Sequence, residues 1–539
     1  MNISVKTKFK VTFITPTPPD ISAFGVRALS AFLRENGYET RIIFLPGSIG
    51  SLKEAGNFVY SYSHHVLNQI IDLCRDSSLI GISFMTNYFD RTKQVTDSLK
   101  RELNIPVMWG GIHPTSNPEE SIRHTDIISI GEGEETLLEL VQKMEKGQDF
   151  YDIKGLWFNK GEQVIKNKLR EPFADLDRLP FFDFSMKEHY ILDHATDSIA
   201  PLDVERFKKI LPRLPHPDNK LKIAYRTMTD RGCPHKCSYC NISNQKEMYD
   251  ELGSKFFRAR SVENFIMELI NIKNRFPFIE AVQFFDDTFF ARPVHEIEEF
   301  SKVYKEKVGL PFYCQGSPNT ITEKKMDYLV NAGMVYVEMG IQTGSERIKH
   351  LYNRNESNEK IIKATELISH YLPRVLAPDY HIILDNPWET TDDVMDTVRL
   401  LMKVPKPYGL CISSLVFFPQ TPLYFKAKKE GLIKDEVSDI YRRPFYIPPR
   451  RSYANFLIYL LTFQHFPKRL LNLLARDTVV RSLSQRNLEF AYKLGYKIGE
   501  KIRFAGKGIK VLYHRDWERI RLYIYKFKAK DPLVEGRKQ

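Results

Sequence analysis

Three cysteines within eight residues carry the most specific chemistry in this chain of 539 residues. They are Cys233, Cys237 and Cys240, and they make up half of the six cysteines present. Three thiolates on one short loop can hold three iron corners of a cubane [4Fe–4S] cluster. The fourth iron then has no protein ligand, and an open coordination site is typical of a catalytic centre. The loop therefore predicts a cluster that binds a small molecule.

Zinc and a disulfide framework are the other interpretations of this loop. Structural zinc needs four ligands. His235 has the right type, but it lies between the cysteines, so the short loop would have to fold back on itself. An odd cluster of cysteines in a cysteine-poor chain is also not typical of a disulfide-bonded secreted protein. Both interpretations are weaker than the iron–sulfur cluster.

The loop resembles that of the radical S-adenosylmethionine (SAM) enzymes. The shared features are the C-x3-C-x2-C spacing and the aromatic Tyr239 just before the third cysteine. The resemblance implies that the open iron binds the amino and carboxylate groups of SAM. One electron from the cluster would then cleave SAM to a 5′-deoxyadenosyl radical. It also implies a partial (β/α)6 TIM-type barrel with its site at the carboxyl ends of the strands, as in full barrels.

Residues 221–430 show the alternation that such a barrel requires. Six β-rich runs are separated by helical segments with apolar residues at i, i+3 and i+4. The six expected strands are Ile223–Met228, Ala281–Phe285, Phe312–Gln315, Val335–Met339, Tyr380–Leu384 and Leu410–Phe417.

The ends of these strands carry the residues that the resemblance assigns to SAM. Adjacent carboxylates at Asp286 and Asp287 are costly to bury without a nearby cation, and the SAM amino group is one; a helix cap or solvated turn is the alternative. Arg347 and Arg354 could reach the SAM carboxylate or form surface ion pairs. The expected SAM contacts are Tyr239, Asp286, Asp287, Glu338, Gln342, Ser345 and Ile383. No residue is assigned a catalytic role.

The N-terminal part also alternates strand and helix. Such alternation predicts a doubly wound, Rossmann-like parallel sheet, with ligands at the carboxyl ends of its strands. The expected strands are Phe9–Thr15, Thr40–Leu45, Leu79–Phe84, Val107–Trp109 and Ile127–Ile130.

The small residues after these strands resemble the cobalamin (B12)-binding domain found in many radical SAM enzymes, including the class B methyltransferases. The resemblance implies cobalamin contacts at Ser83, Met85, Gly110, Gly111, Gly131 and Glu132. Tight turns are the alternative reason for the glycines. The first loop, Pro16–Gly25, lacks the histidine of a D-x-H-x-x-G motif, so cobalamin is expected to be base-off and His-off. His113, which precedes Pro114, is expected to be structural.

Four domains are expected: a cobalamin-binding domain at 1–145, a connector at 146–220, the barrel at 221–430 and a mainly helical extension at 431–539. Residues 441–539 hold 23 Lys and Arg against 7 Asp and Glu, a net charge of +16. The whole-chain charge of +12 therefore leaves −4 for the rest.

The basic extension allows three roles. It could form a cap over the barrel mouth, a contact with anionic membrane lipid, or an RNA-binding surface, the weakest of the three. The apolar run Tyr453–Phe463 and the segment Lys468–Arg476, with Leu470, Leu471 and Leu474 on one face, are the expected membrane contacts.

The resemblance implies a cobalamin-dependent radical SAM enzyme that methylates an unactivated carbon of a small-molecule or lipid substrate. Its electron donor would be a flavodoxin or ferredoxin. The alternatives are cyclisation or rearrangement without methyl transfer, and a corrinoid-binding regulator with a vestigial cluster. A tRNA methylthiotransferase is disfavoured because Cys74 alone cannot hold a second cluster. Cys74, Cys314 and Cys411 are interpreted as buried hydrophobes. With no secretory signal and no apolar run of ~18 residues, the protein is expected in the cytoplasm.

Overall fold

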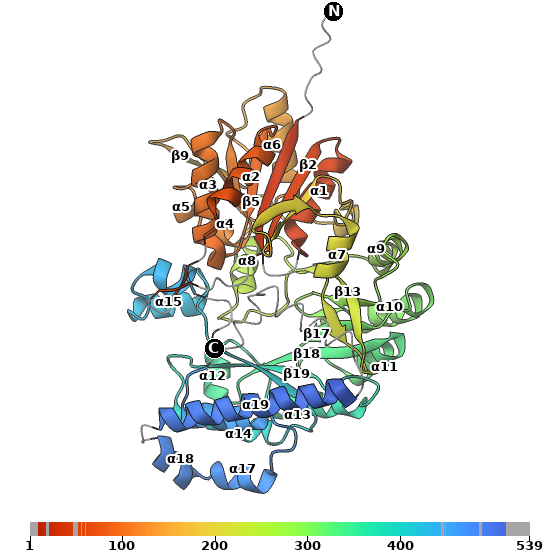
Figure 1. The fold of residues 1–539 in the computed structure, drawn as a ribbon, viewed down its shortest axis with the longest axis vertical. Helices are drawn as coiled ribbons and strands as arrows, with labels where there is room; N and C mark the ends of the chain where they lie inside the picture. Colours follow the sequence, from red (N-terminus) through yellow and green to blue (C-terminus); the bar gives the residue numbers. More distant parts are fainter. Residues whose placement is uncertain are drawn as a thin grey trace, which may run out of the picture.

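A computed structural model describes residues 9–17, 21–46, 52–54, 57–59, 61–443, 447, 449–484 and 488–513. The first domain is built on a nine-stranded sheet (Figure 1) with the order β11-β10-β2-β1-β5-β6-β7-β8-β9. The five predicted strands form its parallel centre. They are β1 (Lys10–Thr17), β2 (Glu39–Pro46), β5 (Leu79–Ser83), β6 (Val107–Gly110) and β7 (Ile127–Ser129).

Helices cover both faces of this sheet, as a doubly wound fold requires. Phe13 of β1 belongs to one apolar core with Leu137 of α6, whereas its neighbour Ile14 belongs to another with Ile70 of α2. Successive strand residues point to opposite faces, so both layers of the core are filled from the same strands. The covering helices are α1 (Phe24–Glu35), α2 (His64–Cys74), α3 (Phe89–Glu102) and α6 (Glu134–Glu145).

The predicted connector is built into both sheets. One hairpin pairs with β7 and another pairs with β2, so they extend the first sheet at its two edges. A short strand, β12 (Arg213–Pro215), pairs with the first barrel strand. The two hairpins consist of β8 (Leu156–Asn159) with β9 (Val164–Lys166), and β10 (His189–Asp193) with β11 (Ser198–Pro201).

The second sheet is a curled half-barrel of seven strands in the order β12-β13-β16-β17-β18-β19-β20. The six strands from β13 to β20 are parallel, as predicted. They are β13 (Leu221–Thr227), β16 (Ala281–Phe284), β17 (Phe312–Gly316), β18 (Met334–Gln342), β19 (Asp379–Leu384) and β20 (Gly409–Ser414). Their outer helices are α9 (Val262–Arg275), α10 (Val294–Lys307), α11 (Glu323–Ala332), α13 (Asn358–His370) and α14 (Thr391–Leu401).

Alternation along β18 separates the two sides of the half-barrel. Val337 and Met339 are buried in the core that the helices cover, whereas Tyr336 and Glu338 are half-buried. The concave side is therefore lined by polar side chains that remain accessible.

The segment after the barrel touches both domains. Following α15 (Pro422–Lys429), a π-helical turn at Val437–Tyr441 packs on the first domain. The ring of Tyr441 lies 5.1 Å from that of Phe89, and Arg442 Nε donates to Asp90 Oδ2 at 2.7 Å.

The C-terminal helices lie at the end of the molecule opposite the first domain (Figure 1). Leu457 and Ile458 of the predicted apolar run are completely buried in a helix that packs on α14. This run is therefore core rather than membrane contact, and none of the described helices is long and apolar enough to cross a membrane. The helices are α16 (Tyr453–Leu461), α17 (Lys468–Leu474), α18 (Asp477–Ser484) and α19 (Glu489–Tyr513).

Candidate active site

The cysteine loop runs from the end of β13 to the start of α8 (Asn241–Asp250). Its first residues are held by Asp286, which is completely buried. The Asp286 carboxylate accepts hydrogen bonds from the Thr229 amide at 2.5 Å, the Thr229 hydroxyl at 3.0 Å and the Asp230 amide at 2.8 Å. These contacts anchor the loop at the strand end. Whether Asp286 also contacts SAM stays a prediction, because its oxygens already serve the loop.

The three cysteines are free thiols and half-buried. Burial, with a contribution from the Asp287 carboxylate, raises the pKa of Cys233 to about 11 and that of Cys240 to about 12. Because the thiolate is the form that binds metal, these side chains require a strongly cationic partner. In the described part of the chain, no three His, Cys, Asp or Glu side chains converge on one point as ligands of a single ion would.

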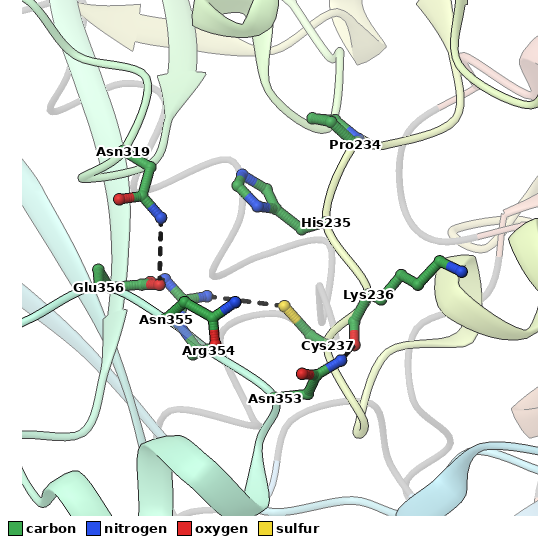
Figure 2. A pocket seen from close by; sticks show the side chains of 9 residues that line it. All are labelled: Pro234, His235, Lys236, Cys237, Asn319, Asn353, Arg354, Asn355 and Glu356. Carbon is green, nitrogen blue, oxygen red and sulfur yellow. Dashed lines mark hydrogen bonds and ion pairs between the residues drawn. The ribbon is translucent and has the colours of Figure 1, made fainter.

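A pocket of about 270 Å³ opens beside Cys237 (Figure 2). His235 does not turn back to the cysteines there, since its Nε2 lies 3.1 Å from the Ser317 hydroxyl. The lining residues are Pro234, His235, Lys236, Cys237, Asn319, Asn353, Arg354, Asn355 and Glu356.

Arg354 of this pocket places a cation beside the cysteine loop. Its Nη1 lies 3.9 Å from Cys237 Sγ and 3.1 Å from the Tyr239 hydroxyl. Its Nη2 donates to the Gly340 carbonyl at 2.9 Å, and it forms an ion pair with Glu356. A buried guanidinium at this position stabilises negative charge on Cys237. Arg347, by contrast, is exposed and pairs with Asp393.

Tyr239 and Ile383 meet in one small apolar cluster. The cluster surrounds the buried side chains of Ile348, Tyr352 and Leu423. The Tyr239 ring lies 5.0 Å from that of Tyr352. Two of the predicted SAM contacts, from the cysteine loop and from β19, are thus brought together beside Cys237.

Asp287, Glu338 and Gln342 line the accessible side of the strand ends. Burial among protein atoms and the neighbouring Asp286 raise the pKa of Asp287 to about 6, although its side chain can be reached by solvent. Gln342 has a left-handed backbone, with φ at 67°. Its Oε1 is buried without a hydrogen-bond partner among the described residues, so it can accept from a ligand.

Ser345 is occupied as a helix cap. Its hydroxyl accepts from the Ile348 amide at 3.3 Å and donates to Asp393 at 2.6 Å. Its predicted contact with SAM therefore finds no support in its hydrogen bonds, and it stays a prediction.

The concave wall carries a cluster that the sequence interpretation missed. His381 Nε2 lies 3.4 Å from Glu338 Oε2. Burial lowers the pKa of His381, but hydrogen bonds to Cys411 and Glu338 outweigh burial and raise it to about 10. Cys411 is half-buried on this wall, so its interpretation as a buried hydrophobe is wrong; Cys74 and Cys314 are buried as predicted. Parallel register places His381 beside Cys411, which residue spacing along the chain does not reveal.

The predicted cobalamin residues after β5 and β6 lie together at the carboxyl edge of the first sheet. Gly111 has φ at +93°, and a Cβ there would lie 2.9 Å from the Ser83 hydroxyl and 3.0 Å from the Phe84 amide nitrogen. Only glycine allows this close approach of the two loops. Ser83, Gly110 and Met85 are half-buried at the same edge. The cobalamin contacts of these residues stay predictions.

Gly131 and Glu132 lie where the two domains meet. A Cβ at Gly131 would collide with the Tyr249 hydroxyl of α8. The Glu132 carboxylate pairs with Arg258 and lies 3.2 Å from Arg231 Nη1. These contacts assign both residues to domain docking, and their contact with cobalamin stays a prediction.

His113 is completely buried. It lies between the rings of Phe84, Phe89 and Tyr441, with centroid distances from 5.0 to 5.2 Å. Burial lowers its pKa to about 3, so it is a neutral core histidine, as expected.

Family models identify both domains. A radical SAM superfamily model matches residues 229–401 and a B12-binding domain model matches residues 11–141. Together they cover more than half of the chain. The chain belongs to the radical SAM superfamily of enzymes and carries an N-terminal B12-binding domain.

Individual proteins are similar to much of this chain. The uncharacterised methyltransferase PH0819 of Pyrococcus horikoshii is 25% identical over 62% of this chain and 66% of its own length. The anaerobic magnesium-protoporphyrin IX monomethyl ester cyclase of Rubrivivax gelatinosus is 23% identical over 64% and 56%, respectively. The chain thus spans less than two thirds of either relative.

A solved structure shares the fold. The cobalamin-dependent SAM radical enzyme OxsB, with aqua-cobalamin and SAM bound, superposes with a TM-score of 0.63 at 14% identity, over 93% of this chain and 81% of its own.

The cofactors that follow from the two domains are a [4Fe–4S] cluster, SAM and cobalamin. The residues fit the cluster and SAM: three free thiols stand beside a buried guanidinium, and both Gln342 Oε1 and Arg354 Nε lack partners among the described residues. Cys233, Cys237 and Cys240 would hold the cluster.

Proposed function

We propose that this protein is a cobalamin-dependent radical SAM methyltransferase that acts on an unactivated carbon of a small-molecule or lipid substrate. The observation that supports it is the way the two sheets face each other. The Ser116 hydroxyl, after β6, donates to Asn241 Oδ1, after the third cysteine, at 3.0 Å. The Tyr249 hydroxyl of α8 accepts from the Glu132 amide, after β7, at 2.9 Å. The elements that follow the carboxyl ends of the strands of both sheets are therefore in direct contact.

When bound, the cofactors supply a 5′-deoxyadenosyl radical and a transferable methyl group. The protein binds and orients them. Arg354 stabilises the negative charge of the Cys237 thiolate that would hold the cluster. The oxygens of Asp287 and Gln342 can accept hydrogen bonds from the ammonium and hydroxyl groups of SAM. Tyr239 and Ile383 provide the apolar surface beside the adenine base of SAM. Ser83, Met85, Gly110 and Gly111 form the edge for a base-off, His-off corrinoid.

The decisive experiment uses SAM with a deuterated methyl group. Anaerobically reconstituted protein, loaded with cobalamin and supplied with reductant, is incubated with candidate lipids and metabolites. A product that carries the deuterated methyl group supports the proposal. A modified product without the label would show cyclisation or rearrangement instead. The similarity to a cyclase favours this alternative. A protein that binds corrinoid yet forms no 5′-deoxyadenosine would be a regulator.

The electron donor is proposed to be a flavodoxin or ferredoxin. A low-potential one-electron donor is needed because the cluster must be reduced before SAM is cleaved. Replacement of a chemical reductant by reduced flavodoxin in the same assay tests this partner.

A further inference from the structure

Helix α19 exposes a continuous apolar stripe. Phe490 is 80% exposed, Leu494 and Ile498 are each 50% exposed, and Ile502 is 59% exposed. A spacing of four residues places these side chains along one side of a helix. Single exposed apolar residues are ordinary on protein surfaces, but a contiguous row of four marks an interaction site.

The opposite side of α19 is pressed against the protein, which fixes the direction of the stripe. A Cβ at Gly495 would lie 2.9 Å from the Phe456 ring, and a Cβ at Gly499 would collide with the Tyr459 hydroxyl. Arg503 lies over the rings of Tyr459 and Phe463 at 4.8 and 4.5 Å. The two glycines allow close packing only in this orientation, so the helix cannot rotate to bury its stripe.

Basic side chains run beside the stripe. Lys493, Lys497 and Lys501 each directly precede one of its apolar residues, and all three are exposed. Glu500 is the only acidic residue between positions 490 and 513. An apolar row flanked by lysines, in a region of net charge +16, is complementary to a surface with anionic groups on the outside and an apolar layer beneath them. That combination is a bilayer containing anionic lipid.

We propose that α19 lies on anionic membrane and that Phe490, Leu494, Ile498 and Ile502 insert into its interface. The expected contact at Lys468–Arg476 is only partly retained, because Leu471 is buried whereas Leu470 and Leu473 of α17 are exposed. α17 and α18 lie near α19 at the same end of the molecule (Figure 1). The membrane contact does not depend on methyl transfer. Its consequence, that the substrate is a lipid drawn from the bilayer, rests on the proposed function.

The test is co-sedimentation of the full-length protein with vesicles of phosphatidylcholine, with and without phosphatidylglycerol. The wild type is expected to bind the anionic vesicles and to be released by rising salt. The double variant L494E/I498E should lose bound protein by about tenfold or more. Met267→Glu, at a 52% exposed site on α9, is the matched control and should bind like the wild type.

The proposal would be overturned by absence of wild-type binding, by equal binding of L494E/I498E, or by binding that does not depend on phosphatidylglycerol. Sedimentation velocity without vesicles tests whether the stripe instead contacts a second copy of the chain. If the wild type is a dimer and L494E/I498E a monomer, the stripe is an interface between two copies and not a membrane contact. Reductive cleavage of SAM by the double variant should equal that of the wild type, so a failure of the proposed chemistry is separable from a failure of membrane binding.

Discussion

Arg231, two residues before the first cysteine of the cluster loop, reaches Glu134 of the B12-binding domain at 2.6 Å. The same guanidinium lies 3.2 Å from Glu132, which also pairs with Arg258. The loop that holds the cluster is thus attached directly to the domain that holds the second cofactor. A change in the docking of the two domains must therefore move the cysteine loop.

Replacing Glu132 with Gln is expected to weaken this attachment in a pH-dependent way. Burial raises the pKa of Glu132, but Arg231, Arg258 and the Phe173 amide outweigh burial and hold it below its ordinary value. The ion pairs therefore contribute stability above pH ~4.5 and lose it as pH falls further. At neutral pH, E132Q should lower the free energy of unfolding by about 3 kcal/mol, because the buried Arg258 guanidinium loses its carboxylate partner.

Thermal unfolding of the apoprotein across pH measures this effect. The gap between wild type and E132Q should close in acid. Glu171→Gln, which removes an exposed pair with Lys154, should melt like the wild type. A gap of the same size at all pH values would contradict the ion-pair explanation.

Cys237→Ala should abolish 5′-deoxyadenosine formation. The cluster would lose one of its three protein ligands, so reconstituted iron content should fall as well. Chromatographic quantification of 5′-deoxyadenosine from SAM and reductant provides the measurement. Cys314→Ala alters a cysteine buried away from the loop and should retain both iron and activity. Reductive cleavage of SAM by Cys237→Ala would refute the cluster assignment.

Arg354→Gln should slow reductive cleavage of SAM by about 10- to 100-fold, since a charge-assisted contact beside the thiolate is lost. The reduced cluster should also form less readily, because the neighbouring positive charge that stabilises added negative charge is gone. Electron paramagnetic resonance of the reduced cluster reports the second effect. Arg347→Gln serves as the matched control, because its exposed guanidinium pairs with Asp393. Equal rates for the two variants would remove Arg354 from the site.

Gly111→Ala should reduce cobalamin retention and thermal stability together. The added Cβ would meet the Ser83 hydroxyl at 2.9 Å and Phe84 backbone atoms at 3.0 Å, which forces apart the loops at the sheet edge. Gly37→Ala is the control for backbone strain alone, with φ at +88° and open space around its Cβ. Absorbance of bound cobalamin after gel filtration compares the two. Full retention by Gly111→Ala would exclude this edge as the corrinoid site.

Bound cobalamin should be base-off and His-off. His113 is buried among aromatic rings and cannot reach a ligand, and the Pro16–Gly25 loop contains no histidine, although residues 18–20 lie outside the described part. The electron paramagnetic resonance spectrum of the Co(II) form should therefore lack superhyperfine splitting from an axial nitrogen. Clear nitrogen splitting would contradict this prediction and show an axial nitrogen ligand, either a histidine from elsewhere in the chain or the nucleotide base of the corrinoid itself.

Local spacing was sufficient for the features that depend on near neighbours. Cys233, Cys237 and Cys240 lie on one loop whatever surrounds them, and a strand-helix alternation permits few arrangements other than parallel sheets. The central strands of both sheets were therefore predicted within a few residues. The end of β18 was predicted at Met339, but the strand continues through a bulge to Gln342, whose backbone is left-handed. The hairpin of β10 and β11 was also missed, since pairing such as His189 with Ile42 joins distant segments.

The tertiary structure alone decided which side chains meet across those distances. It brought Arg354 to Cys237, Arg231 to Glu134 and His381 to Cys411, and it committed Asp286 to holding the backbone of the cysteine loop. It also decided which way α19 faces, because the glycines of that helix acquire their role only against Phe456 and Tyr459. Residue type and periodicity specify how one element can fold. The partners of its side chains follow from the packing of elements against each other, which no local pattern encodes.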